Sequence, residues 1–122
     1  MSATTESFGK VISDLNLQDD VLIIKFTDET RIGLFDDGQC CCEHRYFTTD
    51  DSYLDFIGSV FQGIELKPSR SLGDDYEVHD ITFLEVLTNR GSFVINAHNV
   101  HNGYYGGFNI ISRYLKNHEY ND

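Results

Sequence analysis

The stretch VLIIKFTDETRIGLF at residues 21–35 decides the fold class of this chain. Two runs rich in β-branched and aromatic residues, 21–27 and 31–35, flank the polar residues 28–30. β-branched and aromatic side chains favour strands, whereas Asp and Thr are typical of turns. We therefore predict a β-hairpin here. A second turn is expected at residues 36–38, where two aspartates precede a glycine.

Strand signals continue through the rest of the chain. Residues 40–47 fit a third strand or an ordered loop, and we favour the strand. We predict three more strands at 59–66, 76–87 and 92–97, since each carries β-branched or aromatic residues. Residues 88–91 have the sequence TNRG, which is typical of a turn between the last two strands. Short turns of this kind join antiparallel strands.

Two further segments carry helix signals. The polar residues 48–52 suit the start of a short helix at 53–57, whose apolar residues follow helical spacing until Gly58 ends it. The segment 107–115 fits both the alternation of a strand and the spacing of a helix face, so both assignments stay open. The predicted fold is mostly β, of the α+β class: an antiparallel sheet of about six strands with one or two short helices.

The length and the charge of the chain limit its function. A chain of 122 residues with one proline and no linker-like segment is expected to form a single domain, residues 1–122. Nine basic against 20 acidic residues give a net charge of −11, which opposes binding to duplex nucleic acid or to an anionic membrane. A small anionic ligand remains compatible with this charge if a few arginines line one pocket. The candidates are Arg45, Arg70, Arg90 and Arg113.

The expected location of the protein is the cytoplasm. No stretch approaches the roughly 20 apolar residues of a membrane span, and the first ten residues lack the basic start and apolar run of a signal peptide. The three cysteines are consecutive, at residues 40–42, so they define no framework of long disulfide-closed loops. This arrangement fits a reducing compartment.

The densest functional signal is NAHNVHNGYYGGF at residues 96–108, which gathers His, Asn and Tyr side chains around three glycines. Glycine lets the backbone approach a ligand closely, Asn amides both donate and accept hydrogen bonds, and Tyr offers a ring for stacking. These are the parts of a nucleotide-binding pocket. The alternative is an aromatic-lined turn held by hydrogen bonds from Asn to the backbone.

A second signal is CCEHRYF at residues 41–47, which sets a thiol, an acid, an imidazole and a guanidinium side by side. In a strand, Cys42 and His44 share one face, and Glu43 and Arg45 share the other. Arg45 is then placed either to pair with Glu43 or to bind a phosphate. The alternative is that the cysteines are small core residues and His44 a half-buried side chain.

Metal-binding and catalytic patterns are weak. A zinc site drawing on Cys40 or Cys42, His44, His98 and His101 lacks the spacing of paired cysteines. No Ser-His-Asp signature, P-loop or dinucleotide fingerprint is present in the sequence. We assign no catalytic residue, metal or cofactor, and expect a binding protein rather than an enzyme. One alternative is a metal- or His-dependent nucleotide hydrolase, and another is an interaction module whose acidic surface mimics nucleic acid.

The segments FDDGQCCCEHRYFTTDD at residues 35–51 and HNVHNGYYGGF at 98–108 resemble those of the first type of phage Thoeris anti-defence protein. The resemblance covers nearly the whole chain in the order of its elements, including DYEVHDITFLEVLTN at 75–89. It implies a non-enzymatic protein of the infected bacterial cell that sequesters an immune signal, glycocyclic ADP-ribose, without degrading it. Similar proteins form homodimers with the ligand at the interface, and some form hexamers that hold cyclic di- or trinucleotides.

The resemblance also implies a set of ligand-binding residues. The shared motifs contain His44, Arg45, His98, Asn99, His101, Asn102, Gly103, Tyr104, Tyr105 and Gly106. Arg45 and Arg113 are our choice for phosphate contacts, because a guanidinium matches two phosphate oxygens. We expect Phe83 or Tyr104 to stack on the adenine, and Asn96, Asn99 or Asn102 to bind a base edge or the ribose. The isomer of the signal and the number of subunits beyond two stay open.

Overall fold

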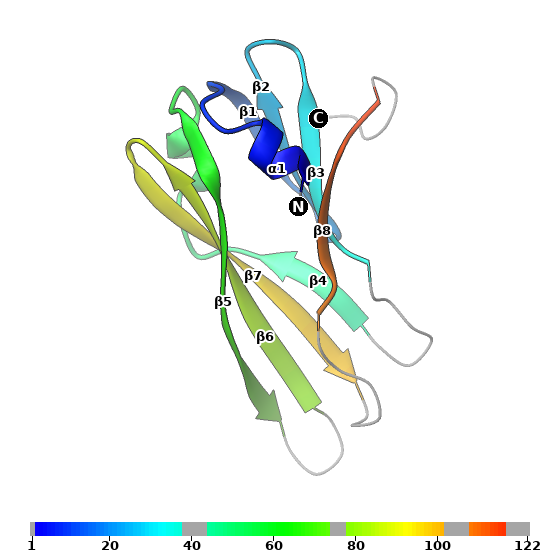
Figure 1. Ribbon diagram of the computed structural model, residues 1–122. Coiled ribbons are helices and arrows are strands. Elements are labelled where there is room, and N and C mark those ends of the chain that lie inside the picture. The colour runs from blue at the N-terminus through cyan, green and yellow to red at the C-terminus, as the bar shows by residue number, and fades with distance from the viewer. Residues whose placement is uncertain (1, 38–43, 74–77, 102–107, 117–122) are drawn as a thin grey trace.

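The computed structural model describes residues 2–37, 44–73, 78–101 and 108–116, with the backbone alone at residues 2 and 68–73. These residues form a mostly β fold of two antiparallel sheets with four strands each, as Figure 1 shows. The elements are α1 (Ser2–Glu6), β1 (Ile12–Leu17), β2 (Val21–Phe26), β3 (Arg31–Asp36), β4 (His44–Thr48), η1 (Tyr53–Phe56), β5 (Phe61–Gly73), β6 (Val78–Thr88), β7 (Gly91–His101) and β8 (Ile110–Tyr114).

The two sheets take their strands from different parts of the sequence. The first sheet has the order β1-β2-β3-β8, and the second sheet has the order β4-β7-β6-β5. The second sheet is therefore built from consecutive strands, whereas the first takes its last strand from beyond the second sheet. β8 runs along β3, with Ile32 opposite Tyr114 and Asp36 opposite Ile110 (Figure 1).

The predicted hairpin at residues 21–35 is confirmed. β2 and β3 pair from Val21 opposite Phe35 to Lys25 opposite Arg31. The turn at 88–91 is also present, between β6 and β7, and Gly91 has a φ of 117°, in the region where glycine lacks the steric penalty of other residues. The predicted short helix is η1, a single turn of 3₁₀ helix.

Several boundaries differ from the sequence prediction. β5 and β7 extend past their predicted ends, to Gly73 and His101, and the open segment 107–115 contains a strand, β8. The predicted third strand is described from His44, because residues 40–43 lie outside the described part of the chain. Two elements, α1 and β1, were not predicted. β1 departs from simple alternation, because its register with β2 shifts between Ile12 and Asp14.

The main hydrophobic core lies between the two sheets. The first sheet supplies Leu22, Ile24, Phe26, Ile32 and Leu34, and the second supplies Phe47, Phe61, Leu84, Val86, Phe93, Ile95 and Ala97. The rings of Phe26 and Phe61 meet edge to face across the sheets, with centroids 5.6 Å apart. β6 and β7 alternate buried and more exposed residues, so the second sheet has an inner face toward the core and an opposite, outer face. β2 and β3 of the first sheet are instead buried along nearly their whole length.

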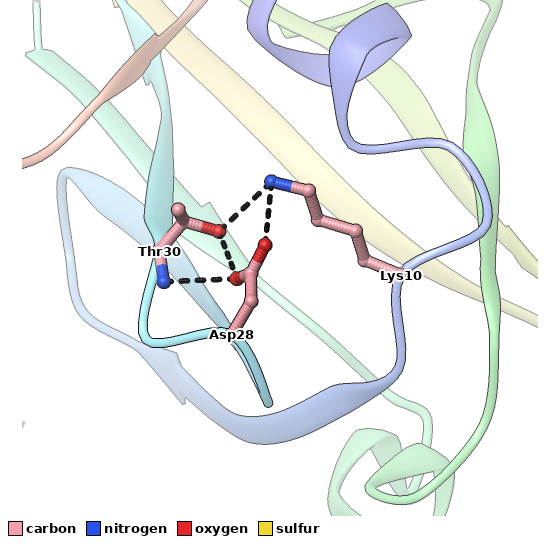
Figure 2. Close-up of polar contacts among 3 residues, drawn as sticks. All are labelled: Lys10, Asp28 and Thr30. Carbon is pink, nitrogen blue, oxygen red and sulfur yellow. Dashed lines mark hydrogen bonds and ion pairs between the residues drawn. The ribbon is translucent and has the colours of Figure 1, made fainter.

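Lys10 ties the segment before β1 to the turn between β2 and β3 (Figure 2). Its Nζ lies 3.0 Å from Asp28 Oδ2 and donates a hydrogen bond of 3.1 Å to Thr30 Oγ1. Both the hydroxyl and the backbone N–H of Thr30 donate to Asp28 Oδ1. The hydroxyl bond is the main reason that the pKa of Asp28 falls from 3.8 to about 2.

None of the described helices has the length and apolar composition that crossing a membrane requires.

Candidate binding site on the second sheet

The structure brings the two densest sequence signals together in one strand pair. β4 carries the end of CCEHRYF and β7 carries NAHNVH, and these strands are antiparallel neighbours. His44 lies opposite Val100, and Tyr46 lies opposite His98. Directly opposed residues point to the same face of a sheet, so the side chains of the two signals meet.

An imidazole cluster lies on the outer face of the second sheet. We give this name to His44, Tyr46, Thr48, His79 and His98, which come from β4, β6 and β7. They alternate with residues that point into the core, such as Phe47 and Ala97. The cluster is half-buried to exposed, so its rings are within reach of a ligand.

His98 is the centre of the cluster. Its ring stacks on Tyr46 with centroids 4.4 Å apart and planes at 5°, while His44 leans on the same tyrosine at 4.9 Å. A hydrogen bond of 2.8 Å joins His98 Nδ1 to His79 Nε2. A second bond of 2.6 Å joins His98 Nε2 to Thr48 Oγ1. Both ring nitrogens of His98 are therefore occupied, and these two bonds with the stacking contact hold its ring in place.

The surroundings of His98 favour its neutral form. Partial burial, which penalises the charged imidazole, is the main cause that lowers its pKa below 6.5, and the nearby His79 lowers it further. Asp50, just after β4, acts in the opposite direction. His98 is therefore a hydrogen-bonded neutral imidazole at neutral pH.

Two more of the predicted residues extend this face. Phe83 lies directly opposite Asn96 in the β6–β7 pair, and Asn96 in turn lies opposite Thr48 of β4. Both side chains are half-buried on the outer face. His44, Phe83, Asn96 and His98 thus share one surface, which combines a ring for stacking, an amide and imidazoles.

Arg45, Asn99 and His101 point to the inner face instead. Arg45 Nη1 lies 2.8 Å from each carboxylate oxygen of Asp36, and both side chains are almost fully buried. His101 Nε2 lies 2.7 Å from Asp80 Oδ2, and Asn99 is fully buried. The structure therefore divides the predicted site into an outer, accessible group and an inner, buried polar group.

Other predicted residues lie elsewhere. Arg113 is on β8 of the first sheet, with its guanidinium 5.0 Å from the ring centre of Phe35. The backbone of Arg70 pairs with Ile81 of β6. Asn102, Gly103, Tyr104, Tyr105 and Gly106 lie outside the described residues, as do the three cysteines. Residues 102–106 follow His101, the last residue of β7, in the sequence. β7 ends at the end of the second sheet where β4 and β6 begin.

Two of the cavities that border the second sheet contain a predicted arginine. The first, of about 290 Å³, lies where β3 and β4 approach, and is lined by Asp20, Phe35, Asp36, Asp37, Arg45, Tyr46 and Phe47. Its three carboxylates outnumber its one guanidinium, which disfavours an anionic group there. The second, of about 370 Å³, is lined by Asp51, Ser52, Asp55, Phe56, Arg90 and Ser92, and is also net acidic. Within the described ranges, no three His, Cys, Asp or Glu side chains are grouped to hold a metal ion.

Sequence reasoning missed Tyr46, Thr48 and His79. Tyr46 and Thr48 follow His44 at intervals of two, so the alternation of a strand already placed them on the same face. His79 carried no such signal, because it meets His98 only through the register of the β6–β7 hairpin. A pairing of strands distant in sequence is not visible in local periodicity.

Comparison with known families identifies the chain as a member of one family. A family model described as a domain of unknown function, DUF7448, matches residues 5–110. The match spans most of the chain, including every residue of the imidazole cluster, and the chain belongs to this family. No curated protein and no solved structure matches the chain.

Proposed function

We propose that the protein binds a small anionic nucleotide signal on the outer face of the second sheet and holds it without turnover. The observation that carries the proposal is the shared surface of His44, Phe83, Asn96 and His98 around the stacked Tyr46. The proposed ligand is a cyclic ADP-ribose isomer, and cyclic oligonucleotides are a second class. The proposed setting is the cytoplasm of a phage-infected bacterium, where such a protein protects the phage from host immunity.

Each part of a nucleotide has a counterpart on this face. The ring of Phe83 offers a surface for a purine, and the amide of Asn96 both donates and accepts toward a base edge or ribose. Imidazole N–H groups bind phosphate oxygens, most strongly when the imidazole is protonated. The outer face therefore suits an anion better than either acidic cavity does.

The resemblance to phage Thoeris anti-defence proteins supports the same function and adds a proposed dimer. Arg113, the proposed phosphate contact, lies on the first sheet, whereas the imidazole cluster lies on the second. A homodimer that brings Arg113 of one protomer to the outer face of its partner reconciles the two assignments. Residues 102–106, which follow β7, are proposed to complete the same site.

The test is capture of the signal from cell extract. The purified protein is incubated with extract of cells in which TIR-domain defence has been triggered, and the ligand released by heat is identified by mass spectrometry. We expect an intact cyclic ADP-ribose isomer. A hydrolysed product, or no nucleotide at all, would contradict the proposal.

A pair of matched variants locates the site. Phe83→Leu removes an aromatic ring from the outer face, and we expect it to weaken binding by about 1–3 kcal/mol, or roughly 5- to 150-fold. Tyr114→Leu is the control, because Tyr114 is a partly exposed ring on β8 of the first sheet. Equal affinity of the two variants, measured by calorimetry on folded protein, would exclude stacking on Phe83.

A second candidate function is hydrolysis of a nucleotide, favoured by one observation. Asp80 orients His101 at 2.7 Å, as a carboxylate orients the general base in many hydrolases. His101 is buried with only 4% of its side chain exposed, which limits its access to a substrate. Product formation that is lost in His101→Asn would establish this alternative and overturn sequestration.

A further inference from the structure

His79 and His98 share a single hydrogen bond, and this bond limits how many protons the two imidazoles hold. His79 Nε2 and His98 Nδ1 are 2.8 Å apart, so one nitrogen carries the hydrogen and the other accepts it. One added proton gives an imidazolium and an imidazole that remain joined, and the bond becomes charge-assisted. A second added proton places a hydrogen on both facing nitrogens and breaks the bond.

Thr48 contacts the same pair. Its Oγ1 lies 2.6 Å from His98 Nε2, so the outer nitrogen of His98 is already in a hydrogen bond. Within the described ranges, Nδ1 of His79 has no hydrogen-bond or ion-pair partner. Nδ1 of His79 is therefore the ring nitrogen of the pair that is open to a ligand.

Among the side chains that the structure describes, few other charges face the pair. From β4 come His44 and Tyr46, Asp50 follows that strand, and Asn96 and Val100 flank His98 on β7. On β6 the next residue on this face is Ile81, and the backbones of Leu72 and Arg70 on β5 lie opposite His79 and Ile81. Among the described residues, Asp50 is a carboxylate whose charge acts on His98, but it forms no ion pair with either imidazole, so a ligand anion is the proposed partner of the added charge.

We propose that the His79–His98 pair is a proton-linked phosphate site, at which the ligand's anionic group binds together with one proton taken up by the pair. This inference rests on the proposed nucleotide binding and adds its regulation by pH. The free pair is mostly neutral at neutral pH, because burial lowers the pKa of His98. Binding of an anion stabilises the singly protonated pair, so affinity rises as pH falls toward the ordinary pKa of histidine.

The size of the effect follows from the number of protons. Uptake of one proton per ligand changes the affinity about tenfold for each pH unit above the pKa of the pair. Affinity therefore increases as the pH falls from about 8, and it levels off below the ordinary pKa of histidine, once the free pair is protonated. A site that binds phosphate through permanent charges shows no such slope.

The experiment is calorimetry with ADP-ribose as the probe, in HEPES and in Tris, two buffers that differ in ionisation enthalpy. The difference in binding heat gives the number of protons taken up. We expect about one proton per ligand for the unmodified protein above pH 7, and less than a quarter of that for His79→Gln, whose amide still donates to His98. Tyr114→Leu is the control, because Tyr114 is an exposed ring on β8 of the first sheet, outside the proposed site, and this variant keeps the uptake.

The possible failures are distinguishable. ADP-ribose binding without proton uptake, or uptake unchanged in His79→Gln, overturns the linked site and leaves nucleotide binding standing. Absence of ADP-ribose binding by the unmodified protein at both ends of the pH range overturns the nucleotide site and this inference with it. Imidazole NMR of the free protein shows whether His79→Gln is folded, and a titration in which His79 and His98 protonate independently would also overturn the pair.

Discussion

Arg45 of β4 reaches across to Asp36 of β3 and joins the two sheets, with its Nη1 2.8 Å from both carboxylate oxygens. The side chains are only 7% and 4% exposed. Asp36 Oδ1 also accepts a hydrogen bond of 3.0 Å from the backbone N–H of Asn109, just before β8. One carboxylate thus connects β3, β4 and the start of β8 at the edge of the core.

We predict that replacing one partner of this pair lowers the free energy of unfolding far more than replacing both. Arg45→Met leaves the buried carboxylate of Asp36 without its counter-charge, and we expect a loss of about 3–5 kcal/mol in the free energy of unfolding. The double variant Arg45→Met with Asp36→Leu should recover most of that loss. Urea denaturation of the three proteins measures this difference. If Arg45 instead served mainly to bind phosphate, Arg45→Met would lower ligand affinity at nearly unchanged stability.

We predict that the protein becomes less stable in mild acid because of His98. Its pKa is lower in the folded than in the unfolded chain, so the unfolded chain binds more protons once the pH falls below about 6.5. The stability that neutral His98 contributes is present above that pH and is lost below it. Urea midpoints at about pH 7.5 and about pH 5.5 measure the loss. The loss should be smaller in His98→Gln, and an equal loss in both proteins would assign the acid sensitivity to other groups.

Asp28 provides a prediction for a more acidic range of pH than His98. Carboxyl NMR should give Asp28 a pKa of about 2, because Thr30 and Lys10 both stabilise its carboxylate. Its contribution to stability is complete above the ordinary pKa of 3.8 and disappears as the pH falls through about 2. Thr30→Val removes the hydroxyl, which is the largest cause, and should move the pKa back toward 3.8. Lys10→Met should move it less, and a larger effect of Lys10→Met would contradict this ranking.

Two glycine-to-alanine variants should destabilise the protein for different reasons. At Gly33 a Cβ would lie 2.8 Å from the ring of Phe35 and 3.1 Å from Leu115, and we expect a loss of about 1–3 kcal/mol from overpacking. At Gly63 a Cβ meets nothing within 4 Å, but φ is +122°, which costs roughly 1 kcal/mol or more. Adding Phe35→Leu should rescue Gly33→Ala and leave Gly63→Ala unchanged in thermal melts. Rescue of both, or of neither, would contradict these causes.

Local patterns in the sequence predicted where the strands lie better than they predicted which strands pair with each other. The β2–β3 hairpin was visible because two apolar runs flank a polar turn of three residues. β1 was missed because its two buried apolar residues, Ile12 and Leu15, are three apart, and the bulge after Ile12 disguises the period of two. β5 was cut short because its register with β6 is interrupted between Lys67 and Arg70, around the proline of the chain.

The candidate site was predicted in part for the same reason. His44 and His98 stood out as members of dense motifs, but nothing local showed that Arg45 and His101 point to the inner face. Their direction follows from strand alternation once the core residues Phe47 and Ala97 are known. The Arg45–Asp36 pair joins two sheets, and sequence spacing alone does not reveal such a contact.

The late position of β8 in the sequence has a consequence for synthesis of the chain on the ribosome. β1, β2 and β3 are made first and then β4 to β7, whereas the strand that covers the open edge of β3 is among the last residues described. Until β8 emerges, the backbone N–H and C=O groups along β3 are an exposed template for another nascent chain. Chains truncated before Ile110 should therefore aggregate, even though every strand of the second sheet is complete in them.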